Sequence, residues 1–457
     1  MPAVLLRAAR FGSDARNATN NMTVEKMPPA IRILLCAAGA IVASLLTACG
    51  SGSSSTTPAN IRLVNATSTS LTLSLNGGYE LAGIAGDNVS GYESVPPGTY
   101  TLSVAAVNGS LSSSPQTLGI GSAQNYTTLA YTRGNVVYAS TITDNLAVPV
   151  AGFTTLDVAN VSPDAGPLNV YVLAPGTNSL AGLSPSYPSV QGLSIASTFA
   201  AGTYDIIVTG ASSQSDVRLT LPGVVFGSSQ VGTLGLTSTS GGTLVNGVLI
   251  AQGGPAQFYP ATQARVRVMS ALPTNVALPT VPFAVAATVG TTALATAYAP
   301  NPNLYALVNG GSAITALTVT PNGGAAFSPT IPAGAFTAGQ DYTILVFGNG
   351  ASAATTFAVL LADDNLIIPS QASVRLVNAA VAGGSGVTMY VAGTQAASGV
   401  LEGTESAYSG VTPATAAQVV LNGGGYNQST VFGFVSGSVY TVFLYDSTLP
   451  PLIFKDR

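Results

Sequence analysis

The chain has 457 residues, enough for three or four domains of ordinary size. Only 7% of its residues are charged and it has no histidine, which excludes Ser-His-Asp and Cys-His catalysis and imidazole metal ligands. Threonine, valine and glycine are abundant and charge is scarce, a composition that favours β-strands over helices with a charged wet face. We therefore expect an all-β protein without a cofactor.

The N-terminal segment, residues 1–48, has the organisation of an export signal. Residues 33–48, "ILLCAAGAIVASLLTA", form an apolar run of 16 residues, shorter than the ~20 needed to span a membrane. Lys26 and Arg32 precede the run and small residues close it, as in a secretory signal peptide. Translation starting at Met22 or Met27 fits this organisation, so the residues before it are interpreted as an over-extended N-terminus. Cys36 would be removed with the signal.

The run ends in Leu46-Thr47-Ala48-Cys49, which resembles the lipobox of bacterial lipoproteins. The resemblance implies cleavage after Ala48 and fatty acylation, such as palmitate, at Cys49; several acyl chains together make a stable membrane anchor. Residues 49–58 then form a Ser/Gly tether. Gly50, where an aspartate would resemble an inner-membrane retention signal, implies the outer membrane, on its periplasmic face or at the cell surface. The alternatives are a chance cysteine or an uncleaved anchor.

Charge outside the signal is sparse and negative. Residues 49–457 contain eight basic and fifteen acidic residues, a net charge of −7, and Lys455 is their only lysine. Nucleic-acid binding needs clustered basic residues that neutralise phosphates. We therefore expect no nucleic-acid partner.

The remaining sequence repeats a unit four times. Alternating runs begin at Asn60, Thr155, Ala264 and Ser373, and each is followed by a second landmark such as "QNYTTLAY" or "QDYTILVF". The separations from Arg62 to Tyr126, Asp157 to Gly232, Arg267 to Tyr342 and Arg375 to Tyr440 are 64, 75, 75 and 65 residues. Short strands and turns in each unit predict immunoglobulin-like β-sandwiches at 59–150, 151–260, 261–370 and 371–457.

The runs "RLVNA", "ANVSPDAGPLNVYV", "AGTYDIIV" and "DDNLIIP" resemble the bacterial domain of unknown function called DUF4397. That family occurs in tandem in exported and lipid-anchored proteins, and the resemblance extends over residues 59–457. The resemblance implies a fold and a location in the cell envelope, but it implies almost nothing about biochemical activity.

Carboxylates are the remaining candidates for chemistry. Asp144, Asp363 and Asp364 end two of the units, where they could hold Ca²⁺ or cap a turn. Glu402 and Glu405 could serve a glycoside hydrolase if they faced each other across a cleft, although their segment is typical of a loop.

Two further groups of residues admit both a binding and a structural interpretation. Arg62, Arg267 and Arg375 occupy one equivalent position, either as a repeated cationic contact along the array, which makes them candidates for binding, or as outward charges that protect a strand edge. Tyrosines could stack on sugars or belong to the core; the examples are Tyr92, Tyr131, Tyr426 and Tyr445.

Together these features predict a lipid-anchored envelope protein of four tandem β-sandwiches with a non-catalytic binding or structural role. The alternatives are a surface adhesin for glycan or protein and a carboxylate-dependent envelope glycoside hydrolase.

Overall fold

The computed structural model describes residues 57–177, 179–272, 283–298, 301–321, 324–380, 386–445 and 450–457. These residues form strands and turns without any α-helix, and so without a helix that could cross a membrane. The predicted all-β class is confirmed. The signal segment, the lipobox and Cys49 lie outside the described residues and stay predictions.

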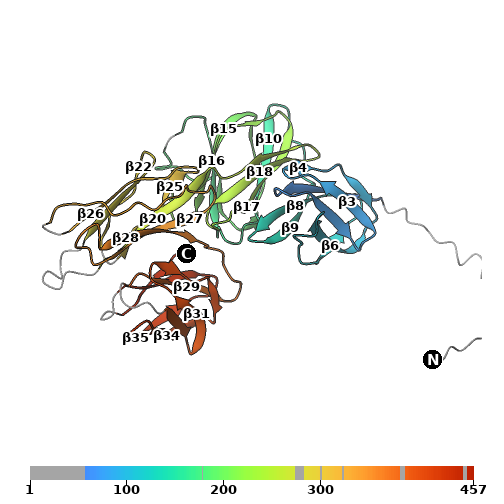
Figure 1. Cartoon of the computed structure of the whole chain (residues 1–457). Coiled ribbons are helices and arrows are strands. Elements are labelled where there is room, and N and C mark those ends of the chain that lie inside the picture. Colours follow the sequence, from blue (N-terminus) through green and yellow to red (C-terminus); the bar gives the residue numbers. More distant parts are fainter. Residues whose placement is uncertain are drawn as a thin grey trace, which may run out of the picture. The chain divides into compact units, whose positions relative to one another are not determined.

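Eight sheets account for the described strands, and they pack in pairs around four separate hydrophobic cores. We call these pairs sandwiches 1 to 4 in chain order, and in each pair the sheet that contains the first strand is the front sheet (Figure 1). This arrangement confirms the predicted sandwich architecture. The exact domain limits given above stay predictions.

In sandwich 1 the front sheet contains β1 (Ala59–Ala66), β4 (Asn88–Val89), β5 (Glu93–Val95), β8 (Asn125–Arg133) and β9 (Val136–Thr143), and the back sheet contains β2 (Leu71–Leu75), β3 (Tyr79–Ile84), β6 (Gly98–Ala106) and β7 (Gln116–Ile120). In sandwich 2 the front sheet contains β10 (Phe153–Asn160), β13 (Gly192–Leu193), β14 (Ser197–Ala200), β17 (Gln230–Ser238), β18 (Val245–Ala251) and β19 (Ala256–Tyr259), and the back sheet contains β11 (Leu168–Leu173), β12 (Tyr187–Val190), β15 (Gly202–Gly210) and β16 (Val217–Phe226).

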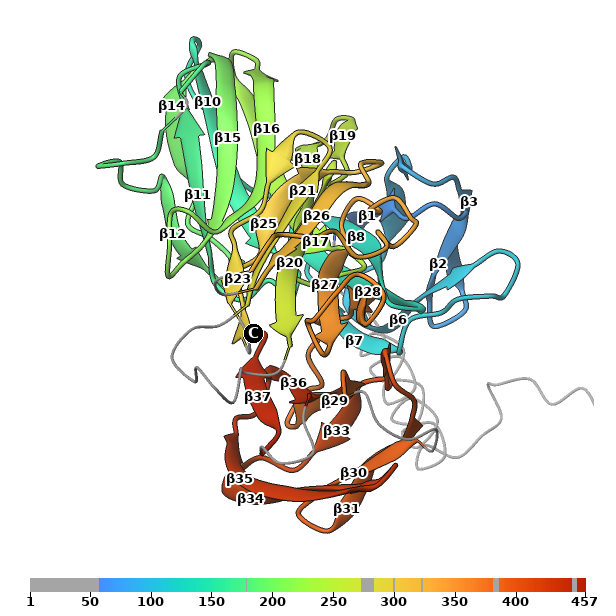
Figure 2. The same cartoon turned by 60° about the vertical axis from the view of Figure 1, so that its left-hand side comes forward.

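In sandwich 3 the front sheet contains β20 (Gln263–Ala271), β24 (Asn301–Pro302), β25 (Ala306–Asn309), β27 (Asp341–Gly348) and β28 (Thr356–Asp363), and the back sheet contains β21 (Ala284–Val289), β22 (Thr292–Ala293), β23 (Ala297–Tyr298) and β26 (Ile314–Thr320). In sandwich 4 the front sheet contains β29 (Ala372–Asn378), β32 (Thr404–Glu405), β33 (Ser409–Val411), β36 (Val439–Leu444) and β37 (Leu452–Lys455), and the back sheet contains β30 (Val387–Val391), β31 (Thr394–Val400), β34 (Ala414–Gly423) and β35 (Tyr426–Phe434). Figure 2 shows the two sheets of sandwich 4 as separate layers.

The two repeated landmarks of the sequence are neighbouring parallel strands. β1 pairs parallel with β8, β10 with β17, β20 with β27 and β29 with β36. In three sandwiches the landmark tyrosine also accepts a hydrogen bond from the main-chain N–H five residues earlier, at 2.8, 3.1 and 3.0 Å; these are Tyr126, Tyr342 and Tyr440. The recurring spacing is therefore the length of chain that returns to pair with the first strand.

The first strand of each sandwich alternates between two buried faces. In β1, Ala59, Ile61 and Leu63 enter the core of sandwich 1, while Arg62 and Val64 point to the opposite face of the sheet. A strand buried on both faces gives a nearly continuous run of buried residues, as "ANIRLVNA" does. The outer face of each front sheet is therefore where the sandwiches can meet.

Candidate functional site: the arginine junctions

The front sheets of the sandwiches pack against each other in two pairs. One apolar cluster joins β1 and β8 of sandwich 1 to β18 of sandwich 2, through Val64, Leu129, Val248 and Ile250. A larger cluster joins the front sheets of sandwiches 3 and 4, with Phe347 and Phe443 among its buried side chains. Burial of these apolar faces is the non-directional part of each junction.

A recurring polar group lies beside each apolar cluster. In sandwich 1, the Arg62 Nε donates to Thr127 Oγ1 at 2.7 Å, and Thr127 donates to Asp144. Tyr92 also donates to Asp144, at 2.5 Å, and its ring lies 4.8 Å from the Arg62 guanidinium carbon. Arg62 and Asp144 themselves are 3.7 Å apart. One carboxylate thus accepts two hydroxyl hydrogen bonds beside one guanidinium.

Sandwiches 3 and 4 repeat this group at equivalent strand positions. The Nε of Arg267 donates to Thr343 at 2.9 Å and that of Arg375 donates to Thr441 at 3.0 Å. These threonines donate to Asp363 at 2.6 Å and to Asp456 at 2.5 Å. Tyr305 and Tyr408 take the place of Tyr92 against the guanidinium groups, at 4.6 and 4.9 Å. We call each such set of arginine, threonine, aspartate and tyrosine a junction quartet.

The quartets of sandwiches 3 and 4 exchange partners across their interface. Arg267 of sandwich 3 lies 2.7 Å from Asp456 of sandwich 4, while Arg375 of sandwich 4 donates to Asp363 of sandwich 3. Arg375 also donates to the Ala362 carbonyl at 3.1 Å and to Glu405 at 2.5 Å. The same pair of positions is used in both directions, as in an isologous interface.

The pair formed by sandwiches 1 and 2 has only half of this arrangement. Arg62 donates to the carbonyls of Ala251, at 2.9 Å, and Gly254, at 2.6 Å, in sandwich 2. Ala251 is the register equivalent of Ala362, since each pairs with the residue at the second landmark. Sandwich 2 has Asp157 in place of the arginine and Gln252 in place of the aspartate.

Burial and neighbouring charge set the protonation of these acids. Burial alone raises the pKa of Asp363, but the guanidinium groups of Arg375 and Arg267 outweigh it and hold the pKa below its ordinary value. Asp157 has no such partner: it is 6% exposed, its Oδ1 has no hydrogen-bond partner in the described part of the chain, and burial raises its pKa. The first acid therefore stabilises its junction as an anion and the second does not.

The interpretation of the three arginines as charges that point outward to solvent is wrong. Arg62, Arg267 and Arg375 are 2%, 4% and 1% exposed, and each lies on a strand that is paired on both sides. They protect no sheet edge, because their charge is used between sandwiches. In the sequence, a strand with one face in the core and the other covered by a second sheet shows the same alternation as a half-exposed strand, which explains the error.

The acidic candidates are also distributed differently from a cation site or a catalytic pair. Asp144 and Asp363 face arginines, an arrangement that repels Ca²⁺, and Asp364 accepts the Leu366 N–H at 3.2 Å, as a turn residue does. Among the described residues, no three His, Cys, Asp or Glu gather where a metal ion could be held. Glu405 binds Arg375, whereas Glu402 is exposed.

The tyrosines named as possible sugar platforms are mostly covered. Tyr131, Tyr426 and Tyr445 are buried, and Tyr92 is half-buried within a junction quartet. The core interpretation of these side chains therefore fits the structure better than the stacking one.

A second charged junction, centred on Asp164, was not predicted. Arg133 of sandwich 1 binds its carboxylate with two hydrogen bonds of 2.6 and 2.7 Å, and Ile367, in the connection between sandwiches 3 and 4, donates its N–H at 2.9 Å. Arg457 lies 3.8 Å from the same carboxylate. The only sequence signal was "SPDAGP", which marks a turn and does not reveal that its aspartate is completely buried.

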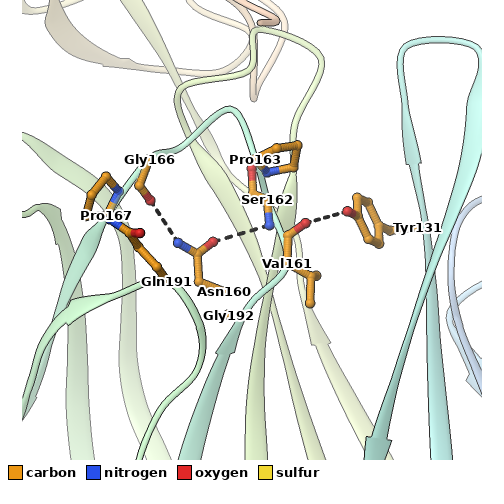
Figure 3. Close-up of a pocket in the computed structure, with 9 residues that line it drawn as sticks. All are labelled: Tyr131, Asn160, Val161, Ser162, Pro163, Gly166, Pro167, Gln191 and Gly192. Carbon is orange, nitrogen blue, oxygen red and sulfur yellow. Dashed lines mark hydrogen bonds between the residues drawn. The ribbon is translucent and has the colours of Figure 1, made fainter. Parts of the chain in front are cut away.

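A pocket of about 500 Å³ lies beside this junction (Figure 3). Its polar side chains are already engaged: Tyr131 donates to the Val161 carbonyl, and Asn160 donates to the Gly166 carbonyl at 2.8 Å and accepts the Ser162 N–H at 3.2 Å. These groups hold the Asn160–Gly166 turn in place and leave little for a ligand to bind.

Comparisons with known proteins agree with the sequence in part. The family described as domain of unknown function (DUF4397) matches residues 59–171, which confirms the resemblance there and leaves it a prediction for the later units. No curated protein matches the chain. The chain is similar to the crystal structure of a proposed cell adhesion protein from Bacteroides uniformis, with 14% identity and a TM-score of 0.22, over 47% of this chain and 98% of that one. It is also similar to the Bacillus anthracis TIE protein, with 9% identity and a TM-score of 0.14, over 83% of this chain and 66% of that one.

Proposed function

We propose that this is an exported, lipid-anchored and non-catalytic envelope protein whose sandwiches act as one stiff body. Cys49 would carry the acyl chains and residues 50–58 would give reach. The stiff body would then hold a binding surface away from the membrane, within the reach of the tether.

The reciprocal exchange of Arg267 and Arg375 with Asp456 and Asp363 is the observation that carries this proposal. Sliding or tilting of sandwiches 3 and 4 while their faces stay in contact would leave a buried guanidinium without its carboxylate, at a cost of about 3–5 kcal/mol, so the exchanged pairs favour one relative orientation. The interfaces between domains in one chain are otherwise often polar and permit relative motion. The chain has few charged residues, and several of them lie at the junctions, where they oppose motion of one sandwich relative to the next.

Distance measurements between two spin labels test the stiffness directly. In a full chain with Cys36 and Cys49 changed to serine, labels are attached at Ala316→Cys on β26 and Ser429→Cys on β35, both exposed positions on back sheets. We expect one narrow distance distribution by pulsed electron paramagnetic resonance. A broad distribution in this chain would contradict the proposal.

A matched pair of variants shows whether the quartets cause the stiffness. Adding Asp363→Ala and Asp456→Ala should broaden the distribution, because each substitution removes the carboxylate of one direction of the exchange. The control variant Glu402→Gln, in sandwich 4, changes an exposed acid outside the quartets and should leave the distance distribution unchanged.

The proposed lipid anchor and the location in the cell envelope need a separate measurement. Intact mass of the native protein should show an N-terminus at Cys49 with acyl chains, and protease treatment of whole cells separates a surface location, where the protein is cleaved, from a periplasmic one. A mass that retains residues 1–48 and no lipid would refute the anchor while leaving the stiffness result untouched.

A further inference from the structure

A second cavity, of about 650 Å³, has walls from three sandwiches. Ser213, residues 215–218 and Thr243 come from sandwich 2, Arg265 and Arg267 of β20 and residues 302–307 from sandwich 3, and residues 454–457 from sandwich 4. This volume lies within the range of small-molecule sites, roughly 300–1,000 Å³. The cavity is not the pocket beside Asp164 described above.

Most of the basic residues that follow Cys49 in the chain line this cavity. Five of these eight basic residues line the cavity, against two acids, Asp216 and Asp456. The basic residues are Arg218, Arg265, Arg267, Lys455 and Arg457. Three more carboxylates lie behind the wall and pair with these arginines, namely those of Asp341, Asp363 and Asp164. The cations thus face the cavity while much of the compensating charge lies behind them.

The guanidinium groups are crowded even with these partners. The pKa of Arg218 is lowered by burial and by the neighbouring charge of Arg265. The pKa of Arg457 is lowered to about 10, mainly by burial, because the repulsion from Arg218, Arg133 and Arg265 counters the attraction of Asp164. An anion in the cavity would relieve this repulsion.

Hydrogen-bond donors of two of these arginines have no acceptor in the described part of the chain. They are the Nε of Arg218 and the Nη2 of Arg267, and Arg267 is only 4% exposed. A guanidinium donates through five N–H groups and accepts none, and its planar fork matches the oxygens of carboxylate, sulfate or phosphate. Both of these donor atoms are covered by protein, so a ligand in the cavity would meet the other N–H groups of the cations that line it, and an oxyanion is the chemical group that matches them.

We propose that this cavity binds an acidic sugar, a ligand whose oxyanion group lies against the arginines and whose hydroxylated body fills the remaining space. The cavity is much larger than a bare oxyanion, and the exposed hydroxyl of Ser213 and the ring of Phe454 belong to its lining. The proposal goes beyond the stiff-body role and is independent of lipid anchoring, since it concerns the folded sandwiches alone.

Calorimetric titration of the full chain in detergent at low ionic strength tests the ligand class. The probes are glucuronate, glucose 6-sulfate, glucose 6-phosphate, glucose and inorganic sulfate. We expect the sugar anions to bind, with an affinity that falls as salt is added, and glucose and inorganic sulfate to bind at least tenfold more weakly. Binding of glucose as tight as that of glucuronate, or of inorganic sulfate as tight as that of glucose 6-sulfate, would overturn the proposal.

Charge variants test the location. Lys455 is exposed on β37, so Lys455→Gln should preserve the fold and weaken binding about five- to tenfold, whereas Lys455→Arg should retain it. Asp216 binds Arg218 at 2.6 Å, so Asp216→Asn should free that guanidinium and strengthen binding about two- to fivefold. Unchanged affinity in both Lys455→Gln and Asp216→Asn would place the ligand elsewhere and refute the site.

Discussion

Asp363 and Asp144 occupy the same position in two sandwiches, yet the structure predicts unequal consequences when each is changed to asparagine. Asp363 lies against two arginines, one from its own sandwich and one from the next. Asp144 lies 3.7 Å from one arginine, Arg62, which also donates to two carbonyls and a threonine. The substitution removes the same charge from the same kind of group in both sandwiches.

The expected magnitudes follow from what each substitution leaves behind. Asp363→Asn leaves Arg267 and Arg375 buried and facing each other, with Asp456 and Glu405 as the remaining acids, and should cost about 3–5 kcal/mol. Asp144→Asn leaves Arg62 with three acceptors, and should cost about 1–2 kcal/mol. The two costs therefore differ by about 1–4 kcal/mol.

Hydrogen exchange followed by mass spectrometry is the suitable assay, because a chain of several sandwiches does not unfold in one step. Peptides from β20 and β29 should exchange faster in Asp363→Asn by roughly 100-fold, the equivalent of ~3 kcal/mol. Peptides from β1 in Asp144→Asn should change by roughly tenfold.

The pH dependence gives a second readout of the same prediction. Because the pKa of Asp363 lies below its ordinary value of 3.8, its contribution is present above that pH and is lost as pH falls through the lowered pKa. The difference between the original chain and Asp363→Asn should therefore persist from pH 7 to about pH 4 and shrink below it. Equal effects of the two substitutions, or a difference unchanged at low pH, would refute the reasoning.

Three further predictions concern other parts of the chain. Because burial raises the pKa of Asp157, its ionisation opposes folding as pH rises above the ordinary 3.8 through the raised value; Asp157→Asn should slow exchange in β10 at pH 7, and faster exchange would count against this. Arg133→Met should leave the buried Asp164 carboxylate without its two-point partner and cost about 3–5 kcal/mol, seen as faster exchange in residues 161–167, whereas unchanged exchange there would contradict the role assigned to the junction. Cys49→Ser should abolish acylation and release the protein from the membrane fraction, and membrane retention would contradict the anchor.

The local pattern of apolar and polar residues was sufficient to predict the sandwich architecture. Alternation of apolar residues has a period of two in any strand, so "NIRLVNAT" and its counterparts indicate strands wherever they lie in the fold. The similar distance to the second landmark, 64–75 residues in the four units, indicated a repeat, and the parallel pairing of Ile61 with Tyr126 gives that distance its structural meaning. Gly134 and Asn135 form the two-residue turn between β8 and β9, and a Gly-Asn pair between two alternating runs is a sequence signal for such a turn.

The use of the charged residues was decided only by tertiary structure. The equivalence of Arg62, Arg267 and Arg375 was visible in the sequence, but the partners of Arg375 include Asp363 from another sandwich, and Arg133 and Asp164 meet across a second boundary. A residue on the outer face of a sheet has the same sequence signature whether water or another sheet covers that face. Because contact between sheets depends on how separate units pack, and not on the period of any one strand, the sequence determined the strands and their repeat, and the packing decided that the arginines are buried.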